Sequence, residues 1–332
     1  MPSRGASRIR PLVARALKIT RHVNYWIVAQ LALTVLRILR LLPAAASLNL
    51  LDRTARRIGP LMGRHRAALS NLRAAYPEKD EAELARIALD MWGNMARLVG
   101  EYVYMAQLTR ADPATGLPAN IEIVGEELFV RLREEKGPHI FFTGHLGNFE
   151  ILPTVAAAYD LEISALFRAP NNPFLAAQLM ETRSESMGEL IASGRGSAFT
   201  LARILDKGGN IGLLVDQKFS GGIATTFFGR PCQTNPLLAK LARQYDCPVH
   251  PARCVRLPGN RFRLELHEKL DLPRTEKGTV DVNATAQLLN DVVEGWIRED
   301  PGQWMWFHRR WEVRLRQRFR RPKPRAPKPG QG

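Results

Sequence analysis

Between residues 121 and 299 the sequence alternates short apolar runs with longer segments that repeat their apolar residues every three or four positions. The first pattern predicts β-strands and the second predicts helices. Strands are predicted at residues 121–124, 139–144, 162–167, 211–216, 248–257 and 261–270, and helices at residues 126–136, 148–159, 173–187, 197–207, 236–245 and 283–299. Strands that alternate with helices build parallel sheets, whose apolar faces the helices cover. Pro-Gly-Asn at 258–260 favours a hairpin between the last two strands, so we predict an α/β fold with a mixed, mainly parallel sheet flanked by helices.

The most apolar part of the sequence lies near its N-terminus. Residues 23–36 contain no charged side chain, and these 14 residues would make about 21 Å of helix. Extension to Leu42 gives the roughly 20 residues that cross a bilayer. That extension includes Arg37 and Arg40, which can reach the interface from near a helix end. Residues 23–43 are therefore predicted to form a membrane-anchoring helix, spanning or interfacial, with a buried core helix as the alternative.

The remaining segments differ in composition. Residues 1–22 are basic, and the sequence contains no Asp or Glu before Asp52. Residues 44–112 show the apolar spacing of amphipathic helices, and residues 113–312 contain the predicted α/β domain. Residues 313–332 combine basic residues with prolines and contain no acid, so this tail is predicted to be disordered.

Charge and cysteine content limit the partners. A net charge of +16 favours anionic partners such as membrane surfaces, acidic carrier proteins or nucleic acids. Nucleic-acid binding is disfavoured, because the sequence shows no helix-turn-helix or zinc-finger pattern and no interleaving of basic and aromatic residues along the strands. A non-enzymatic basic membrane-binding protein stays an alternative class. The three cysteines, at positions 232, 247 and 254, have no metal-ligand spacing, so no metal site and no disulfide framework is predicted.

The segment IFFTGHLGNFEI, residues 140–151, carries the strongest candidate for chemistry. On one continuous helix, five positions correspond to about 500° of rotation, so the side chains of His145 and Glu150 would diverge. They can meet only if His145 lies in a turn and Glu150 in the first turn of the next helix, with Asn148 as a candidate N-cap. A carboxylate at one imidazole nitrogen makes the other nitrogen a base. The motif contains no Ser or Cys, so the nucleophilic hydroxyl would belong to the substrate.

Two further candidates follow the ends of other predicted strands. Reactive groups in α/β sheets gather at the carboxyl ends of the strands, where Arg168 and Asp216 are expected. Arg168 is a candidate for contact with an anionic headgroup, and a strand-end surface arginine is the alternative. Asp216 is predicted to form part of the site wall, with a turn cap as the alternative.

Several blocks together resemble the lauroyl/myristoyl acyltransferases of lipid A biosynthesis, the late acyltransferases of the H-x4-D/E superfamily. GHLGNFE (144–150) is similar to the H-x4-D/E block of that family. The other similar blocks, in the family's order, are HRAALSNLRAAYPE (65–78), FRAPNNPFL (167–175), GGNIGLLVDQKFSGGIATTFFGRPCQTNPLLAKLA (208–242) and QWMWFHRRW (303–311). Five blocks in order are more specific than one, and they extend over about residues 50–312. The tail beyond Trp311 lies outside the resemblance.

The resemblance implies a glycerolipid-acyltransferase-like fold and acyl transfer without cofactor or metal. The donor would be an acyl carrier protein thioester, and the acceptor the 3-hydroxyl of a hydroxyacyl chain on a lipid A precursor of the Kdo-lipid IVA type. His145 would be the general base and Glu150 would orient it. Backbone N–H groups near Asn148, or Arg168, would stabilise the oxyanion. The residues themselves suggest the substrate-binding candidates, of which Arg309 and Arg310 can match phosphate oxygens bidentately; the full set is Arg168, Asn171, Asn172, Asp216, Gln217, Lys218, Arg309 and Arg310.

The expected location is the inner membrane, with the catalytic domain on the cytoplasmic face and membrane lipids as further partners. The chain lacks the Phe-Pro-Glu-Gly-Thr-Arg type of block that binds glycerol phosphate, and FFGRP (227–231) lacks the acid. Another membrane glycolipid, such as a phosphatidylinositol mannoside, is the alternative acceptor. Trp304, Trp306 and Trp311 are expected in the core or in an interfacial belt rather than against a ligand.

Overall fold

The computed structural model describes residues 6–110, 118–135, 137–167, 170, 172–177, 190–194 and 196–311. The helices are α1 (Ala6–Leu39), α2 (Ala44–Ile58), η1 (Gly59–Leu61), α3 (Gly63–Ala75), α4 (Glu81–Leu108), α5 (Glu126–Glu134), α6 (Ile151–Ala158), α8 (Ser197–Asp206), α9 (Leu237–Tyr245), α10 (Val282–Glu299) and η2 (Pro301–Gln303). The strands are β1 (Ile121–Val124), β2 (Ile140–Thr143), β3 (Ile163–Phe167), β4 (Leu190–Ala192), β5 (Asn210–Leu214), β6 (Ile223–Phe227), β7 (Arg230–Thr234), β8 (Val249–Leu257) and β9 (Arg261–Leu266).

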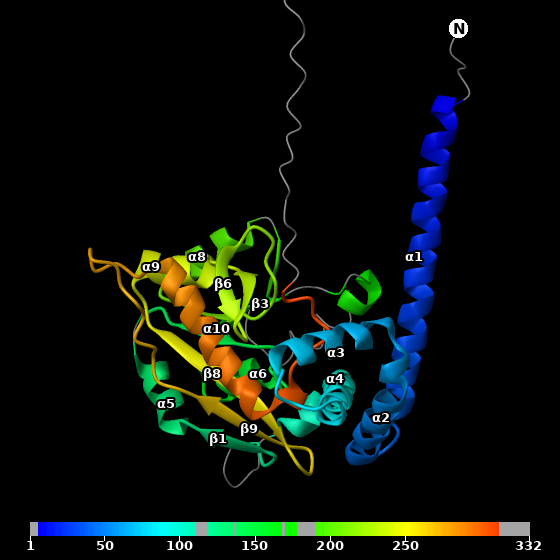
Figure 1. Ribbon diagram of the computed structural model, residues 1–332, viewed down its shortest axis with the longest axis horizontal. Helices are drawn as coiled ribbons and strands as arrows, with labels where there is room; N and C mark the ends of the chain where they lie inside the picture. Colours follow the sequence, from blue (N-terminus) through cyan, green and yellow to red (C-terminus); the bar gives the residue numbers. More distant parts are fainter. Residues whose placement is uncertain are drawn as a thin grey trace, which may run out of the picture.

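Seven strands form the central sheet, in the order β1-β9-β8-β2-β5-β3-β4 (Figure 1). The pair β8–β9 is antiparallel and the other neighbours are parallel. The predicted α/β class with a mixed, mainly parallel sheet is confirmed, and so is the hairpin at 258–260. β6 and β7 form a separate antiparallel pair, which the sequence pattern did not predict.

Each face of the sheet has its own hydrophobic core. Phe142 and Leu213 belong to the core on the side of α8, α9 and α10, together with the first half of α4. Phe141 belongs to the core on the side of α5 and α6. Neighbouring residues of a strand point to opposite faces, so the apolar run of β2 supplies both cores. This burial on two faces explains why β2 has no polar alternation.

The N-terminal helix is longer than the anchor predicted at residues 23–43, because α1 begins at Ala6. One helix in the described part of the chain, Lys18–Leu39, is long and apolar enough to cross a membrane, and 11% of that window is buried. Trp26, Leu31 and Ile38 are exposed on it. The C-terminal end of α1 is fixed, since Ser47 Oγ and the Tyr104 hydroxyl both donate to the Leu39 carbonyl.

Two other predictions meet the limits of the described residues. The predicted tail, 313–332, lies outside them, and the helix predicted at 173–187 is described only as far as residue 177.

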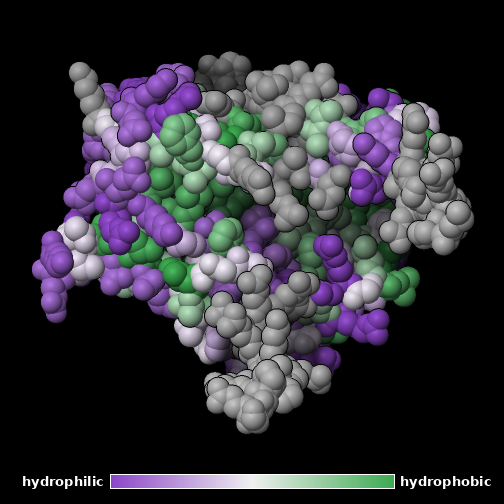
Figure 2. Space-filling model, turned by 90° about the horizontal axis from the view of Figure 1, so that it is seen from above, coloured by the Kyte–Doolittle hydropathy of each residue, from purple (hydrophilic) through white to green (hydrophobic). Residues whose placement is uncertain are grey.

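The helix predicted at 148–159 begins at Ile151, three residues later than expected. Seen from above, hydrophobic residues gather around a hollow left of and near the middle of the view, and hydrophilic residues lie along the left edge and also beside the hollow (Figure 2).

Candidate active site

The candidate site lies at the carboxyl ends of β2 and β5, which are neighbours in the sheet. Thr143 at the end of β2 pairs with Leu214 at the end of β5. The chain continues from β2 into a turn with His145 and from β5 into a loop with Asp216. Parallel pairing therefore brings together two side chains that are 71 residues apart. The expectation that His145 lies in a turn is confirmed.

Asp216 holds His145 at two points. Its Oδ1 lies 2.7 Å from His145 Nδ1, and its Oδ2 accepts hydrogen bonds from the His145 backbone N–H at 2.8 Å and from Trp304 Nε1–H at 2.7 Å. The side chain is buried, 2% exposed. Burial alone would raise the pKa of Asp216, but the electrostatic attraction to His145 and the hydrogen bonds from His145 and Trp304 outweigh it and hold the pKa below its usual range. Asp216 is therefore a carboxylate.

The tautomer of His145 follows from these partners. A carboxylate only accepts hydrogen bonds, so Nδ1 carries the proton that faces Asp216. His145 Nε2 lies 2.9 Å from the side-chain amide nitrogen of Gln217. An amide NH2 group donates, so Nε2 accepts and is the basic nitrogen of the ring. The His145 and Phe149 rings also make an edge-to-face contact, with centroids 4.9 Å apart.

Hydrogen bonds and close packing hold the turn that carries His145 in place. Gly147 has φ +56° and donates its N–H to the Gln303 carbonyl at 3.2 Å. A Cβ at Gly147 would lie 2.0 Å from the Cys254 carbonyl oxygen, so only glycine fits there. Asn148 Nδ2 donates to Glu101 Oε2 at 2.8 Å, and Glu101 is paired with Arg256 in the interior. These contacts leave the His145 loop little freedom to move.

Asn148 does not cap α6 in the way expected. The residue at the N-cap position is Glu150, and Asn148 Oδ1 accepts from the Glu150 backbone N–H at 3.1 Å. Asn148 stabilises the turn before the helix instead. The physical reason is that the turn after β2 uses three more residues before the chain reaches helical geometry.

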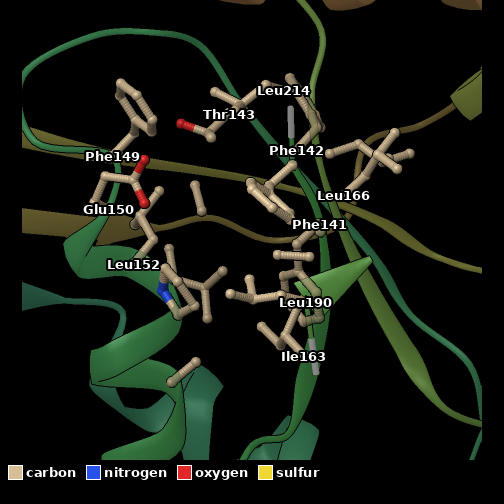
Figure 3. Close-up of a pocket in the computed structure, with 18 of the residues that line it drawn as sticks. Phe141, Phe142, Thr143, Phe149, Glu150, Leu152, Ile163, Leu166, Leu190 and Leu214 are labelled. Carbon is tan, nitrogen blue, oxygen red and sulfur yellow. The ribbon is translucent and has the colours of Figure 1, made fainter. Parts of the chain in front are cut away.

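Glu150 does not occupy the place predicted for it at the imidazole ring. Asp216 lies at Nδ1 and Gln217 at Nε2, so the carboxylate that orients His145 in this structure is Asp216. The Glu150 side chain lines a cavity beside Phe149 and Thr143 (Figure 3). A direct part for Glu150 in the reaction stays a prediction.

The cavity is apolar and lies between α6 and the sheet. It is a narrow cavity of about 100 Å³. Its walls are aliphatic and aromatic side chains from α5, α6 and the strands β2, β3, β4, β5, β8 and β9. Thr143, Phe149 and Glu150 are its lining residues nearest to His145 in the sequence. The basic nitrogen of His145 and an apolar cavity therefore share one edge of the sheet.

The other predicted site residues have varied surroundings. Arg168 and Asn171 lie outside the described residues. Asn172 is buried; its Nδ2 donates to the Tyr25 carbonyl of α1 at 2.7 Å, and its Oδ1 accepts from the Phe174 N–H at 3.0 Å. The Lys218 backbone N–H donates to His308 Nε2 at 3.0 Å. Arg309 is exposed. Contact of these side chains with substrate stays a prediction.

The prediction that Arg310 binds substrate is wrong. Its side chain is completely buried, where it donates to the Gln233 carbonyl at 2.8 Å, Thr234 Oγ1 at 2.7 Å and Asn290 Oδ1 at 3.0 Å. Desolvation lowers the pKa of this guanidinium. A phosphate cannot reach it, so Arg310 joins β7 to α10 and has a structural role.

Sequence reasoning missed the part that Trp304 plays in the site. The expectation that the tryptophans lie in the core is confirmed, since Trp304, Trp306 and Trp311 are buried. A buried indole N–H nevertheless needs an acceptor. For Trp304 that acceptor is Asp216, so one core residue also orients the carboxylate. Among the described residues, no group of three or more His, Cys, Asp or Glu side chains could hold a metal ion.

The sequence is similar to a known family of acyltransferases. The profile of the family described as bacterial lipid A biosynthesis acyltransferase matches residues 14–313. The chain is also 24% identical, over 290 residues, to the lipid A biosynthesis myristoyltransferase of Escherichia coli (strain K12). The match covers 86% of this chain and 87% of that protein.

Proposed function

We propose that this chain, which belongs to the bacterial lipid A biosynthesis acyltransferase family, transfers a fatty acyl chain from an acyl carrier protein thioester to the 3-hydroxyl of a hydroxyacyl chain on a lipid A precursor. The precursor is of the Kdo-lipid IVA type. The observation that carries the proposal is the His145–Asp216 pair, with its basic nitrogen at the edge where an apolar cavity meets the strand ends.

In the proposed reaction, the acceptor hydroxyl displaces the Gln217 amide from His145 Nε2, which then takes the hydroxyl proton as the oxygen attacks the thioester carbonyl. A C–O ester bond to the acceptor forms and the C–S bond of the thioester breaks. The carrier leaves as a thiolate, which receives the proton from His145. Asp216 keeps the proton on Nδ1 and stabilises the imidazolium that forms. A thiolate is a better leaving group than an amine, so one base with oxyanion stabilisation suffices. Backbone N–H groups of the turn after β2, or Arg168, are the candidates for that stabilisation.

The cavity supports a lipid substrate. Its lining is almost entirely apolar, as burial of an acyl chain requires. The chain would lie between α6 and the sheet with its thioester near Phe149, beside the imidazole ring. Glu150, at the same end, would lie close to the reacting groups.

The surface supports a membrane location. The exposed apolar side chains of α1 fit a bilayer, and the net charge of +16 fits anionic headgroups, a phosphorylated acceptor and an acidic carrier protein. We propose the inner membrane, with the catalytic domain on the cytoplasmic face, where carrier-bound acyl chains are available.

The proposal is tested with purified protein in detergent, an acyl carrier protein thioester and a Kdo-lipid IVA-type acceptor, with products identified by mass spectrometry. We expect a gain of one acyl chain, and a loss of about 10²–10⁴ in kcat for His145→Ala. His267→Ala, which removes an exposed histidine, is the matched control and should keep wild-type activity. Acylation of a phosphatidylinositol mannoside, with none of the lipid A precursor, would contradict the proposed acceptor. Wild-type activity in His145→Ala would contradict the mechanism.

A further inference from the structure

One row of side chains on the α6 face of the sheet is small at its centre. Phe141 of β2 pairs with Gly212 of β5, Gly212 pairs with Ala165 of β3, and Ala165 pairs with Leu190 of β4. Paired residues of parallel strands point to the same face, and all four of these residues line the apolar cavity. Across the sheet, the side chain is large at Phe141, absent at Gly212, small at Ala165 and large again at Leu190. The cavity is therefore deep at Gly212 and Ala165.

The row has a fixed place between the two ends of the cavity. Thr143 and Leu214 lie two residues nearer to the carboxyl ends of their strands, which is about 6.6 Å along a strand. Ile163 lies two residues farther from that edge than Ala165. In Figure 3, Thr143, Phe149 and Glu150 lie at the end opposite to Ile163. A chain that enters near His145 must pass Gly212 before it reaches Ile163.

The backbone does not require glycine at position 212. Gly212 lies within β5 and is not among the described glycines with positive φ. A Cβ there would lie 3.1 Å from Ile163 Cγ2 and 4.0 Å from Ala165 Cβ, so alanine needs a shift of only a few tenths of an ångström. Glycine weakens a strand and often marks the close approach of a ligand. A larger side chain would project into the cavity between its two ends.

We infer that Gly212 and Ala165 determine the length of the acyl chain that this enzyme transfers, because their small size keeps open the path from the His145 end of the cavity to Ile163. This inference rests on the proposed acyl transfer. The ligand is a straight saturated acyl chain, whose methylenes fill the space above these two residues. Each methylene that can no longer be buried lowers the relative rate or affinity about fourfold.

The test is a competition among carrier-bound acyl chains of different even lengths, with products quantified by mass spectrometry. Gly212→Val should move the preferred length down by two carbons or more and change the ratio of long to short products about 15-fold. Ala165→Val should shift the profile in the same direction. Ser164→Val is the matched control, because Ser164 pairs with Ile211 and faces the opposite core. This control should keep the wild-type profile.

A second measurement separates this inference from the proposed function. Calorimetric titration with free fatty acids of increasing length reports on the cavity without turnover, and Gly212→Val should lose affinity for long chains only. If the Gly212→Val variant fails to fold, both measurements are repeated with Gly212→Ala. Wild-type protein that acylates no acceptor refutes the proposed function, and the fatty acid series then still decides this inference. An equal loss for all lengths in folded Gly212→Val, or the same shift in Ser164→Val, would overturn it.

Discussion

Replacement of Asp216 by asparagine exchanges one carboxylate oxygen for an NH2 group. One hydrogen-bond acceptor of the site thereby becomes a donor. One carboxylate oxygen faces a single donor, His145 Nδ1–H, whereas the other faces two donors, the His145 backbone N–H and Trp304 Nε1–H. Asparagine has one oxygen and one NH2 group. An NH2 group placed towards the two donors would leave both of them unpaired. The oxygen therefore takes the place of Oδ2, and the NH2 group faces Nδ1.

The expected consequence is a change of tautomer. Pairing two donors rather than one is worth about 1 kcal/mol of net hydrogen bonding, and avoiding a buried unpaired donor adds roughly 1–3 kcal/mol. Asparagine is thus held in the orientation that forces Nδ1 to accept and places the proton on Nε2. No lone pair then remains on Nε2 to take the proton of the acceptor. In serine proteases the equivalent change lowers kcat about 10⁴-fold, and we expect a loss of about 10³–10⁴ here.

The assay is acyl transfer with kcat and KM measured separately, together with ¹⁵N NMR of the His145 ring. Asp216→Asn should lower kcat, leave KM within a few-fold of wild type and move the ring proton from Nδ1 to Nε2. Glu150→Gln is the matched control, because it makes the same carboxylate-to-amide change at the cavity and should leave the tautomer unchanged. Near-normal kcat in Asp216→Asn, with a 10³-fold loss in Glu150→Gln, would refute this reasoning and assign the orienting role to Glu150.

Three further predictions concern stability and location. Arg310→Ala should lower the free energy of unfolding by about 3 kcal/mol, because buried acceptors lose their donor; an unchanged urea midpoint would argue against this. Burial lowers the pKa of His308 to about 4, so the fold favours the neutral ring. Stability from His308 is full above its unfolded pKa, near 6.5, and falls as the pH drops from there towards 4, by at most about 3 kcal/mol. Urea midpoints at pH 5 and pH 7 should therefore differ more in wild type than in His308→Gln. Deletion of residues 1–39 should move the protein out of the membrane fraction, and its retention there would contradict α1 as the main anchor.

The sequence pattern predicted the framework because the framework is local. Apolar runs such as those of β2 and β5 are visible without their neighbours, and the predicted helices that lie wholly within the described residues have the right positions to within a few residues. The pair β6–β7 was missed because its residues, IATTF and RPCQT, contain no continuous apolar run. It is stabilised by non-local contacts, with Thr234 hydrogen-bonded to Asn290 and Trp311 Nε1–H to the Phe227 carbonyl.

The site was predicted in its position but not in its pairing. His145 and Asp216 follow strand ends, so the sequence placed both at the same edge of the sheet. The H-x4-E spacing drew attention to Glu150, since only near neighbours are visible as pairs in a sequence. The adjacency of β2 and β5, which brings Asp216 to His145, is a property of strand order that local patterns do not contain.

The hydrogen bond from Trp304 to Asp216 also bears on the order of events during protein synthesis. Trp304 follows Asp216 by 88 residues, and at about 5–20 residues per second the ribosome needs roughly 4–18 seconds to make that stretch. The isolated β-bridge between Leu146 and Trp304 waits for the same segment. The catalytic pair therefore remains unfinished for seconds after both of its members have been translated. With the membrane location proposed above, the nascent chain, whose α1 is made first, can reach the membrane well before its site can transfer an acyl chain.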